Sequence, residues 1–499
     1  LWDIVLINQF HDILPGTSIA SVYDDSDADY AKLFAAMLST QGPLQSTLRT
    51  LCPPSDGQLS LVNFTGQKRG GELVEFCTDV DISASAIRTR SGGSAIQSIT
   101  RADGSTSFVA TVSNIPAMGW SAAQVVQIGR TPGTSLGVSE THLENDLVVV
   151  RFDETGEIKS VFDKTLAREL IQSGKRANQL IAYEDKPQNY DAWDIDHYFE
   201  EKCWPLSNTP ASIEVVETGP HRAALRIERQ YARSRVVQVI SLQDGQKQIE
   251  FDTHIDWQER QTLLKTGFPF DLNVSETRAE IQFGHVKRPS HKNTSWDQAR
   301  FETSMHRWVD MSEPDFGAAL LTDCKYGYDA IEQNLRLTLL KGPNMPDPDA
   351  DLGVHRFRYA LLLHQGEQDL SQVVRAGERF NNPVMVHGLI KNGEAEQREL
   401  EKNFSFASVD TANLTLETVK LSEKGNDAIL RIFEHANRRS TGRLQFGLPV
   451  EDVTETDLME RTSGPSYDIK ENAVELTFRP FEIKTLKVAF EQQNLPEKE

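Results

Sequence analysis

The sequence predicts a mainly β protein: a short N-terminal helical segment followed by multiple β-sandwich domains. Helical periodicity is clear up to about residue 41 and largely disappears after residue 58. Alternation of apolar and polar residues then dominates, with turn signals between the runs, and it returns from about 413 to 490. Because long all-β domains with short strands are usually sandwiches, we expect sandwiches here.

The 499 residues are enough for several domains. We expect four segments along the chain. They are 1–50, the end of a helical bundle; 58–130, a small β domain; 140–390, a large β domain; and 400–490, a C-terminal β-sandwich.

The first segment predicts two helices. Apolar residues at helical spacing cover residues 1–14, and Pro15-Gly16 ends that element. A second amphipathic helix is predicted from about Ile19 to Gln41. The chain starts with Leu1 and not Met, in the middle of a helical pattern, so we expect a fragment or a cleaved product. The absence of a signal peptide is then uninformative.

Two hairpins are the clearest β features. One lies between residues 236 and 257 and turns at Asp244-Gly245, a strong hairpin signal. The other covers 148–163, and a further helix is expected within 364–383. Alternation along the first hairpin also predicts a polar face directed at solvent, made of Glu250, Asp252, His254 and Asp256.

The composition excludes several classes of function. With 52 Lys+Arg against 73 Asp+Glu, the net charge is −21, which disfavours nucleic-acid and anionic-membrane binding. No apolar run approaches the ~18 residues of a membrane-spanning helix. Cys52, Cys77, Cys203 and Cys324 are far apart, which favours a reducing cytoplasm over a disulfide framework.

His11 and Asp12 form the first candidate site. At a helix end opened by Pro15-Gly16, the two side chains can approach one pocket, where imidazole suits Zn²⁺ and a carboxylate suits a metal or sugar hydroxyls. Taken alone, these residues favour another interpretation: His11 interacts with the helix C-terminal dipole and Asp12 is solvated. A zinc site needs about four ligands, and the pair supplies at most two.

A second candidate is the segment 189–201, rich in acids and aromatic residues. In it, Tyr190, Trp193 and Asp194 have the composition of a sugar site, since rings stack on sugar faces and carboxylates accept from hydroxyls. An acidic loop over packed aromatic residues explains the segment equally well. Asp323 and Lys325 follow a strand-like run and are expected at a strand end or in a loop, where sites often lie.

Several long segments carry a family resemblance: "INQFHDILPGTS" (7–18), "NQLIAYEDKPQNYDAWDID" (178–196), the stretches 293–329 and 339–364, and "RPFEIKTLKV" (479–488). They resemble the bacterial and cytosolic branch of the class II α-mannosidases, glycoside hydrolase family 38. The resemblance covers nearly the whole chain.

The resemblance implies an architecture of β/α barrel, three-helix bundle and large β-sandwich domains, with a central supersandwich that is galactose-mutarotase-like. This sequence would start in the last part of the bundle, so the barrel is not within it. The implied activity is zinc-dependent hydrolysis of terminal α-mannosyl residues with retention, through a covalent glycosyl-enzyme. The implied partners are a mannose-containing glycan and the barrel of the same protein, and a homo-oligomer stays open.

The resemblance also implies roles for single residues. The histidine of the bundle motif, a ligand of the single Zn²⁺, corresponds to His11, and the following sugar-binding aspartate to Asp12. The other three zinc ligands, the nucleophile and the acid/base carboxylate belong to the barrel, so the chain alone is expected to be inactive and to bind zinc weakly. The region of Tyr190, Trp193 and Asp194 would border the sugar, and Asp323 and Lys325 are further substrate-binding candidates.

Two other interpretations remain open at this point. The chain is a noncatalytic carbohydrate-binding or structural module with "DAWDID" (191–196) as its contact surface, or a β-sandwich enzyme such as an epimerase or lyase. The last would need a self-contained carboxylate or histidine pair in the large β domain.

Overall fold

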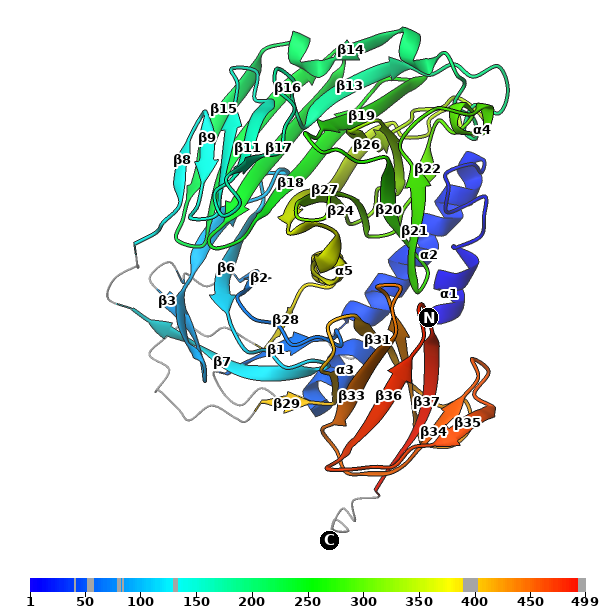
Figure 1. Cartoon of the computed structure of the whole chain (residues 1–499). Helices are drawn as coiled ribbons and strands as arrows, with labels where there is room; N and C mark the ends of the chain where they lie inside the picture. The colour runs from blue at the N-terminus through cyan, green and yellow to red at the C-terminus, as the bar shows by residue number, and fades with distance from the viewer. Residues whose placement is uncertain are drawn as a thin grey trace.

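Strands are the dominant secondary structure of the computed structural model and far outnumber helices, which confirms the mainly β prediction. The structure describes residues 1–39, 42–51, 58–78, 82, 85–128, 133–388 and 403–491, so Cys52 lies outside the described residues. Figure 1 shows the large β domain at the top, the small β domain at the lower left and the C-terminal sandwich at the lower right. The N-terminal helices run from the right side toward the lower centre.

Three helices form the N-terminal segment: α1 (Trp2–Ile7), α2 (Ala20–Leu38) and α3 (Pro43–Leu51). The helix predicted over 1–14 is shorter than expected, because the chain leaves the helical path at Asn8 and continues in turns. The Asn8 side chain donates to the carbonyl oxygen of Ile4 at 2.9 Å, in the way that such residues compete with helical backbone bonds.

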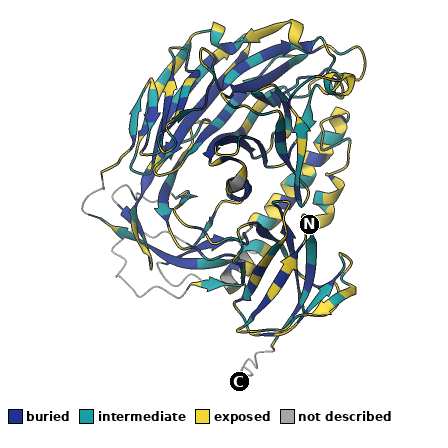
Figure 2. Ribbon diagram, in the orientation of Figure 1, coloured by how far each residue is buried: buried dark blue, intermediate teal, exposed yellow. Residues whose placement is uncertain are grey.

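The apolar residues of this segment are largely exposed. The side chains of Trp2 (76% exposed), Leu6 (63%) and Ile7 (64%) are open to solvent, and α1 buries no residue. Figure 2 shows the exposed colour along much of α1 and α2. Exposed apolar residues gathered on one short segment are typical of an interaction surface in soluble proteins.

The small β domain consists of two sheets. Its strands are β1 (Leu59–Asn63), β2 (Glu72–Phe76), β3 (Ser85–Thr89), β4 (Gly92–Ala95), β5 (Gln97–Thr100), β6 (Thr106–Val112) and β7 (Gly119–Gln127). One sheet has the order β28-β1-β7-β3-β4 and the other β2-β6-β5. Two strands from much later in the chain, β28 (Met385–His387) and β29 (Phe404–Ser405), pair with β1 and β7. The small domain therefore combines residues that precede the large domain in the sequence with residues that follow it.

The large β domain is built around two extended sheets. One has the order β15-β16-β17-β18-β27-β24-β23-β20-β21 and the other β14-β13-β19-β26-β25-β22. The strands of the first sheet are β15 (Ala211–Thr218), β16 (Arg222–Tyr231), β17 (Ser234–Gln243), β18 (Gln248–Trp257), β20 (Glu276–Ile281), β21 (Gly284–Pro289), β23 (Trp308–Ser312), β24 (Gly317–Thr322) and β27 (Gly353–His364). Those of the second are β13 (Gln179–Glu184), β14 (Cys203–Pro205), β19 (Thr262–Pro269), β22 (Thr303–Ser304), β25 (Gly327–Ile331) and β26 (Asn334–Leu340).

A smaller sheet precedes these two in the chain. It has the order β12-β11-β10-β9-β8, with β8 (Gly137–Ser139), β9 (His142–Glu144), β10 (Val148–Phe152), β11 (Ile158–Asp163) and β12 (Arg168–Glu169). The short helix α4 (Ser295–Gln298) and the 3₁₀ turns Phe199–Glu201, Leu206–Asn208 and Gly366–Asp369 complete the domain.

Both predicted hairpins are confirmed. β10 pairs with β11, and β17 pairs with β18 in a register that places Val236 opposite Ile255. Apolar residues on one face of β18, such as Phe251 and Trp257, are fully buried in the core between the sheets. Their burial removes apolar area from water, worth roughly 25 cal/mol per Å², and this makes the register hard to change.

The prediction for the other face of β18 was wrong. Glu250 is only 8% exposed, and the Asp252 side chain is 14% exposed. The small β domain covers this face, and Arg101 from the β5–β6 connection contacts both carboxylates. Strand alternation correctly placed them on the face opposite the core, but it could not show that a second domain packs there.

The predicted helix within 364–383 is α5 (Leu370–Asn381). Its apolar side packs on the outer face of the large sheet, where Val373, Val374 and Phe380 join one buried cluster with Trp308 and Leu321. This packing fixes which side chains of α5 point away from the sheet.

The C-terminal sandwich follows. Its strands are β30 (Ala407–Val409), β31 (Leu414–Leu421), β32 (Ala428–Glu434), β33 (Ser440–Phe446), β34 (Val450–Thr456), β35 (Thr462–Ser466), β36 (Ala473–Phe478) and β37 (Ile483–Phe490). They form sheets with the orders β30-β33-β36 and β31-β32-β37-β34-β35. His435, directly after β32, joins this sandwich to the rest of the molecule. Its ring nitrogens lie 2.9 Å from the Thr415 hydroxyl and 3.2 Å from the Ser371 hydroxyl of α5.

His435 makes stability depend on pH. Burial, with a further contribution from the nearby Arg375 charge, lowers the pKa of His435 to about 3. The unfolded chain binds a proton below about pH 6.5, whereas the folded chain does not until about pH 3. The contribution of the neutral His435 to the free energy of unfolding is therefore intact above pH 6.5. Below that pH it is lost by about 1.4 kcal/mol per pH unit.

We expect wild-type stability to fall by about 2–3 kcal/mol more than that of His435→Gln between pH 7 and pH 4.5, measured by urea unfolding. His306→Gln, at an exposed histidine, is the matched control and should follow the wild type. If the stability of His435→Gln and of the wild type depended equally on pH, His435 would not be the source of this pH dependence.

Candidate functional site

The turn after α1 holds the His11–Asp12 pair. The carbonyl oxygen of Asp12 accepts hydrogen bonds from the hydroxyls of Ser18 (2.9 Å), Thr17 (3.3 Å) and Tyr23 (3.3 Å). The backbone is thus fixed while both side chains stay accessible: His11 is 79% exposed and Asp12 41%. His11 Nε2 lies 3.7 Å from Asp12 Oδ2, so the two side chains meet despite being adjacent in the chain.

This pair fits part of a metal site. Among the described residues, no group of three or more His, Cys, Asp and Glu side chains is placed to hold a metal ion. One imidazole and one carboxylate supply at most two of the four ligands of a typical zinc site. The exposed position of the pair suits a site that is completed by residues from elsewhere.

The segment between β13 and β14 is anchored by polar contacts with residues 341–344. Lys341 donates from Nζ to Asp185 Oδ2 at 2.5 Å and to the carbonyl oxygen of Asp194 at 2.8 Å. The backbone nitrogen of Asn344 donates to Asp191 Oδ2 at 2.6 Å. Asp185 is 1% exposed, and burial raises its pKa although Lys341 acts in the opposite direction.

This anchoring brings Tyr190, Trp193 and Asp194 together. The backbone nitrogens of Trp193 and Asp194 both donate to the carbonyl oxygen of Tyr190, at 2.7 and 2.9 Å. Tyr190 has a φ of +55°, a conformation that costs of order 1–3 kcal/mol in a non-glycine residue. The rings are 71% and 56% exposed, which leaves two aromatic surfaces and a carboxylate on one rigid turn.

Asp323 and Lys325 lie in a different cluster, beside β27. Asp323 accepts from the backbone nitrogen of Arg358 at 3.0 Å, and its carboxylate is 3.5 Å from the Arg358 guanidinium. The Lys325 ammonium lies 4.7 Å from the centre of the Phe357 ring.

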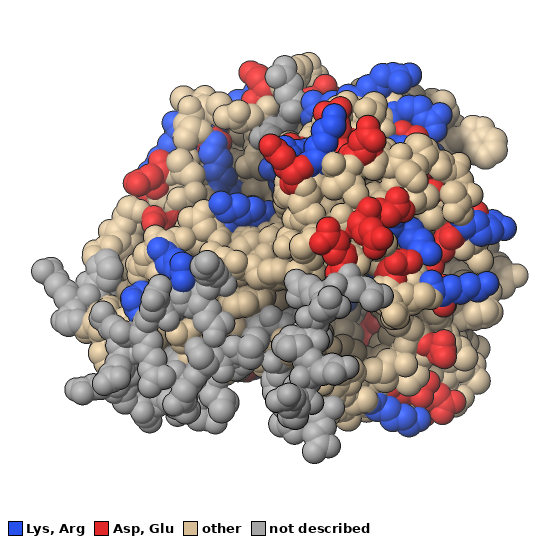
Figure 3. All heavy atoms as spheres, turned by 90° about the horizontal axis from the view of Figure 1, so that it is seen from below, with Lys and Arg blue, Asp and Glu red and all other residues tan. Residues whose placement is uncertain are grey.

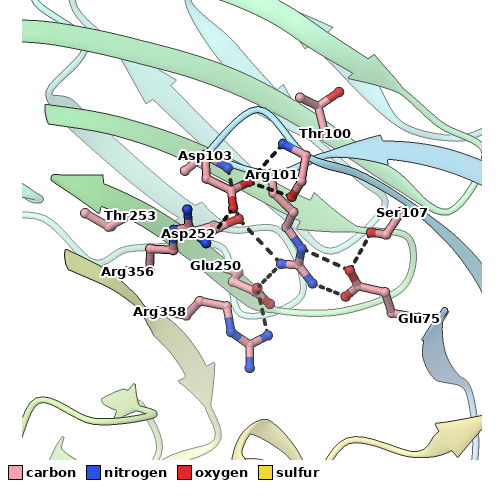
Figure 4. A network of polar contacts seen from close by, with 12 residues as sticks. Glu75, Thr100, Arg101, Asp103, Ser107, Glu250, Asp252, Thr253, Arg356 and Arg358 are labelled. Atoms are coloured by element: carbon pink, nitrogen blue, oxygen red, sulfur yellow. Dashed lines mark hydrogen bonds and ion pairs between the residues drawn. The ribbon is translucent and has the colours of Figure 1, made fainter. Parts of the chain in front are cut away.

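Sequence reasoning missed a network of charged residues between the small and large β domains, shown in Figure 4. Arg101 donates from Nε to Glu75 at 3.0 Å, and its Nη1 lies 3.7 Å from Glu250 and 3.5 Å from Asp252. Arg358 Nη1 is 3.4 Å from Glu250. A signal for part of it was present: acids at 250 and 252 and arginines at 356 and 358 share a two-residue spacing, and β18 pairs with β27 so that Asp252 is opposite Arg358.

A membrane-spanning helix is not found in the described part of the chain, where every helix is too short or too polar to cross a bilayer.

Family models match three parts of the chain. Residues 1–49 match the alpha mannosidase middle domain, 143–349 match the glycosyl hydrolases family 38 C-terminal domain, and 413–486 match the family 38 C-terminal beta sandwich domain. The first range ends within α3 and contains the His11–Asp12 turn.

Relatives and solved structures agree with these matches. Alpha-mannosidase 2C1 of Homo sapiens is 31% identical over 97% of this chain, and Alpha-mannosidase G of Dictyostelium discoideum is 29% identical over 98%. The chain spans 45% and 47% of these proteins, less than half of their length. An alpha-mannosidase from Enterococcus faecalis V583 has the same fold, with a TM-score of 0.77 and 16% identity over 98% of this chain and 63% of that one.

The order of helices, small β domain, large β domain and C-terminal sandwich, together with these matches, settles the assignment. The chain belongs to glycosyl hydrolase family 38 and corresponds to the end of the middle domain and the C-terminal β domains of its members.

Proposed function

We propose that the chain is the C-terminal portion of a zinc-dependent retaining α-mannosidase, which hydrolyses terminal α-mannosyl residues. Its similarity to proteins named alpha-mannosidases over almost all of its length carries the proposal. The nucleophile and the acid/base carboxylate come from an N-terminal barrel outside these 499 residues. The chain alone is therefore inactive in this proposal.

The exposed apolar residues of α1 and of the turns that follow it support a missing partner domain. Trp2, Leu6, Phe10 and Leu14 are each more than half exposed, which is costly for a surface that stays in water. The same segment carries His11 and Asp12. A barrel that covered these apolar residues would also approach the pair, and its ligands would complete the zinc site.

In this proposal His11 is one zinc ligand and Asp12 accepts hydrogen bonds from sugar hydroxyls. The bound metal would supply a Lewis acid that holds sugar hydroxyls near the reacting carbon. Retention needs two carboxylates about 5–5.5 Å apart on opposite sides of the scissile bond. Since Asp12 is one carboxylate on a turn that also presents a metal ligand, we assign it to binding and not to covalent catalysis.

We assign further sugar contacts to Tyr190, Trp193 and Asp194. Their two exposed rings and one carboxylate on a fixed turn match the needs of a sugar, which offers apolar ring faces and hydroxyl donors. Asp323 and Lys325 already engage Arg358 and the Phe357 ring, so we place them outside the primary sugar contacts.

A cytoplasmic location is part of the proposal. The described cysteines Cys77, Cys203 and Cys324 are free thiols at exposed positions, which suits a reducing compartment.

The second candidate function is a noncatalytic carbohydrate-binding module. The exposed Tyr190 and Trp193 rings favour it, because a sugar-binding surface needs no zinc and no barrel. The two candidates differ in what they need: the enzyme requires a barrel with further zinc ligands before Leu1, and the module does not.

The test compares the 499-residue chain with the longer gene product on an aryl α-mannoside. We expect no turnover by the chain and zinc-dependent turnover by the longer protein. In the longer protein, His11→Ala should lower both zinc affinity and activity by at least ~100-fold, since loss of a ligand exceeds the 10–100-fold cost of losing a second-shell partner.

His306→Ala, at an exposed histidine of the large domain, is the control and should leave zinc content and activity unchanged. Turnover by the 499-residue chain alone would contradict the assignment of the nucleophile to the barrel. A longer protein that binds mannosides without hydrolysing them would support the module instead.

A second prediction concerns the turn that presents Tyr190 and Trp193. Lys341→Met leaves the buried Asp185 carboxylate without its cation, and losing one partner of a buried pair costs about 3–5 kcal/mol. We expect faster amide hydrogen exchange in residues 186–198 and weaker mannoside binding by the longer protein. Lys186→Met removes an exposed lysine paired with Glu184 and should change neither. Unchanged exchange in Lys341→Met would show that the turn does not depend on this pair.

A further inference from the structure

The turn that presents Tyr190 and Trp193 lies in an acidic part of the chain. Residues 184–202 contain seven carboxylates and two lysines, and residues 341–352 contain three carboxylates and one lysine. The two segments are in contact, since the backbone nitrogen of Ala192 donates to the carbonyl oxygen of Met345 at 3.1 Å. Ten acids to three bases is a far larger excess than the 73 to 52 of the whole chain. On the face of the molecule seen from below, Lys and Arg lie beside Asp and Glu (Figure 3).

The cations that reach residues 184–202 are already committed to acids. Among the described residues, four lysines and arginines form ion pairs with this segment: Lys186 and Lys202 share Glu184, Lys341 is held by Asp185, and Arg336 is held by Glu200. These cations engage only three of the seven carboxylates. A ligand at the turn therefore meets cations whose charge is already compensated.

The other four carboxylates have no ion-pair partner within the described part of the chain. They are Asp191, Asp194, Asp196 and Glu201, and the first three lie within three residues of Trp193. Asp196 accepts from neutral donors, the Gln188 backbone nitrogen and the Tyr198 hydroxyl, both at 2.8 Å. These hydrogen bonds lower the pKa of Asp196, so it is charged at neutral pH. Negative charge therefore surrounds the exposed rings without a cation to balance it.

Hydrogen-bond acceptors are also in excess beneath the turn. The atoms Asp185 Oδ1, Asp191 Oδ1 and Asn344 Oδ1 are buried and find no donor among the described residues. Burial raises the pKa of Asp185, and the charge of Asp191 acts in the same direction, against that of Lys341. Oxygens without donors leave their partial negative charge uncompensated in a medium that screens it poorly. The field at the turn is thus negative from its surface and from its interior.

We propose that this turn discriminates between ligands by charge: it accepts α-mannosides whose aglycone, the group bound to the mannose, is neutral or cationic, and it rejects anionic ones. The inference rests on the sugar contacts proposed above for Tyr190, Trp193 and Asp194, and it goes beyond them by naming the class of mannoside. The rings stack on the sugar whatever its aglycone. The surrounding carboxylates act over several ångströms through water, so their effect depends on the ligand's charge and is screened by salt.

The experiment measures the dissociation constants of three matched mannosides for the 499-residue chain, by ligand-observed NMR titration at pH 8. The 2-hydroxyethyl α-mannoside is neutral, the 2-aminoethyl α-mannoside is cationic and the carboxymethyl α-mannoside is anionic. In ~10 mM salt we expect the cationic mannoside to bind roughly tenfold more tightly than the anionic one, with the neutral one between them. In ~0.5 M salt the three affinities should agree within about twofold, since screening then acts within a few ångströms.

Charge-neutralising variants test which residues discriminate. In Asp196→Asn/Asp347→Asn the amide oxygen can still accept, because both hydrogen bonds of Asp196 go to one oxygen and Asp347 accepts only from the Asp349 backbone nitrogen, at 3.0 Å. This double variant should lower the ratio of cationic to anionic affinity by roughly threefold and leave the affinity for the neutral mannoside unchanged. Glu451→Gln/Asp468→Asn removes two exposed charges from the C-terminal sandwich and should keep the wild-type ratio. Trp193→Ala should abolish binding of all three mannosides, which locates binding at the turn.

Three outcomes would overturn the inference. The first is equal affinity of the wild type for the three mannosides at low salt. In the second, Asp196→Asn/Asp347→Asn weakens all three alike, which would make the two residues structural only. The third is no binding of any of them, or binding that Trp193→Ala does not affect, which would remove the sugar contacts of the turn as well. Turnover by the longer protein is measured separately, so the mannosidase proposal and this inference can fail independently.

Discussion

Arg101 holds the small β domain against the large one, and much of the molecule depends on this contact. It reaches Glu75 of its own domain and both Glu250 and Asp252 of β18, an interior strand of the large sheet that pairs with the central strand β27. Pairs of this kind gain little over well-packed apolar residues, but removing one partner leaves buried charge at a cost of about 3–5 kcal/mol. The network therefore specifies how the domains dock more than it adds to their stability.

Docking in this orientation has consequences beyond the contact itself. The chain leaves the small domain, builds the whole large domain, and returns through α5 to add β28 beside β1. Two contacts thus hold α5 in place: its apolar side packs on the large sheet, and the strand that follows it, β28, pairs within the small domain. A cavity lies between the domains that this return path connects, and Glu75, Arg101 and residues of α5 all line it.

Local patterns predicted the elements better than their surroundings. Asp244-Gly245 placed one hairpin and the alternation of 249–257 placed the core side of β18, because both depend on backbone geometry that neighbouring residues determine. Whether Glu250 faces water depends on the small β domain, which lies more than 100 residues earlier in the chain, and no local pattern contains that information. α1 ended early for a local reason, the Asn8 side chain bond to Ile4, which periodicity of apolar residues does not register.

The His11–Asp12 turn shows why a site residue is harder to predict than a fold. The hydroxyls of Thr17, Ser18 and Tyr23 fix the backbone at Asp12, and this is achieved without any metal. The fold therefore presents the pair whether or not a ligand completes it, and the pair alone looks like an ordinary helix end. Metal affinity arises only when about four ligands converge. Since at most two are on this turn, the proposed zinc site would form only where another part of the full protein covers the exposed N-terminal helices.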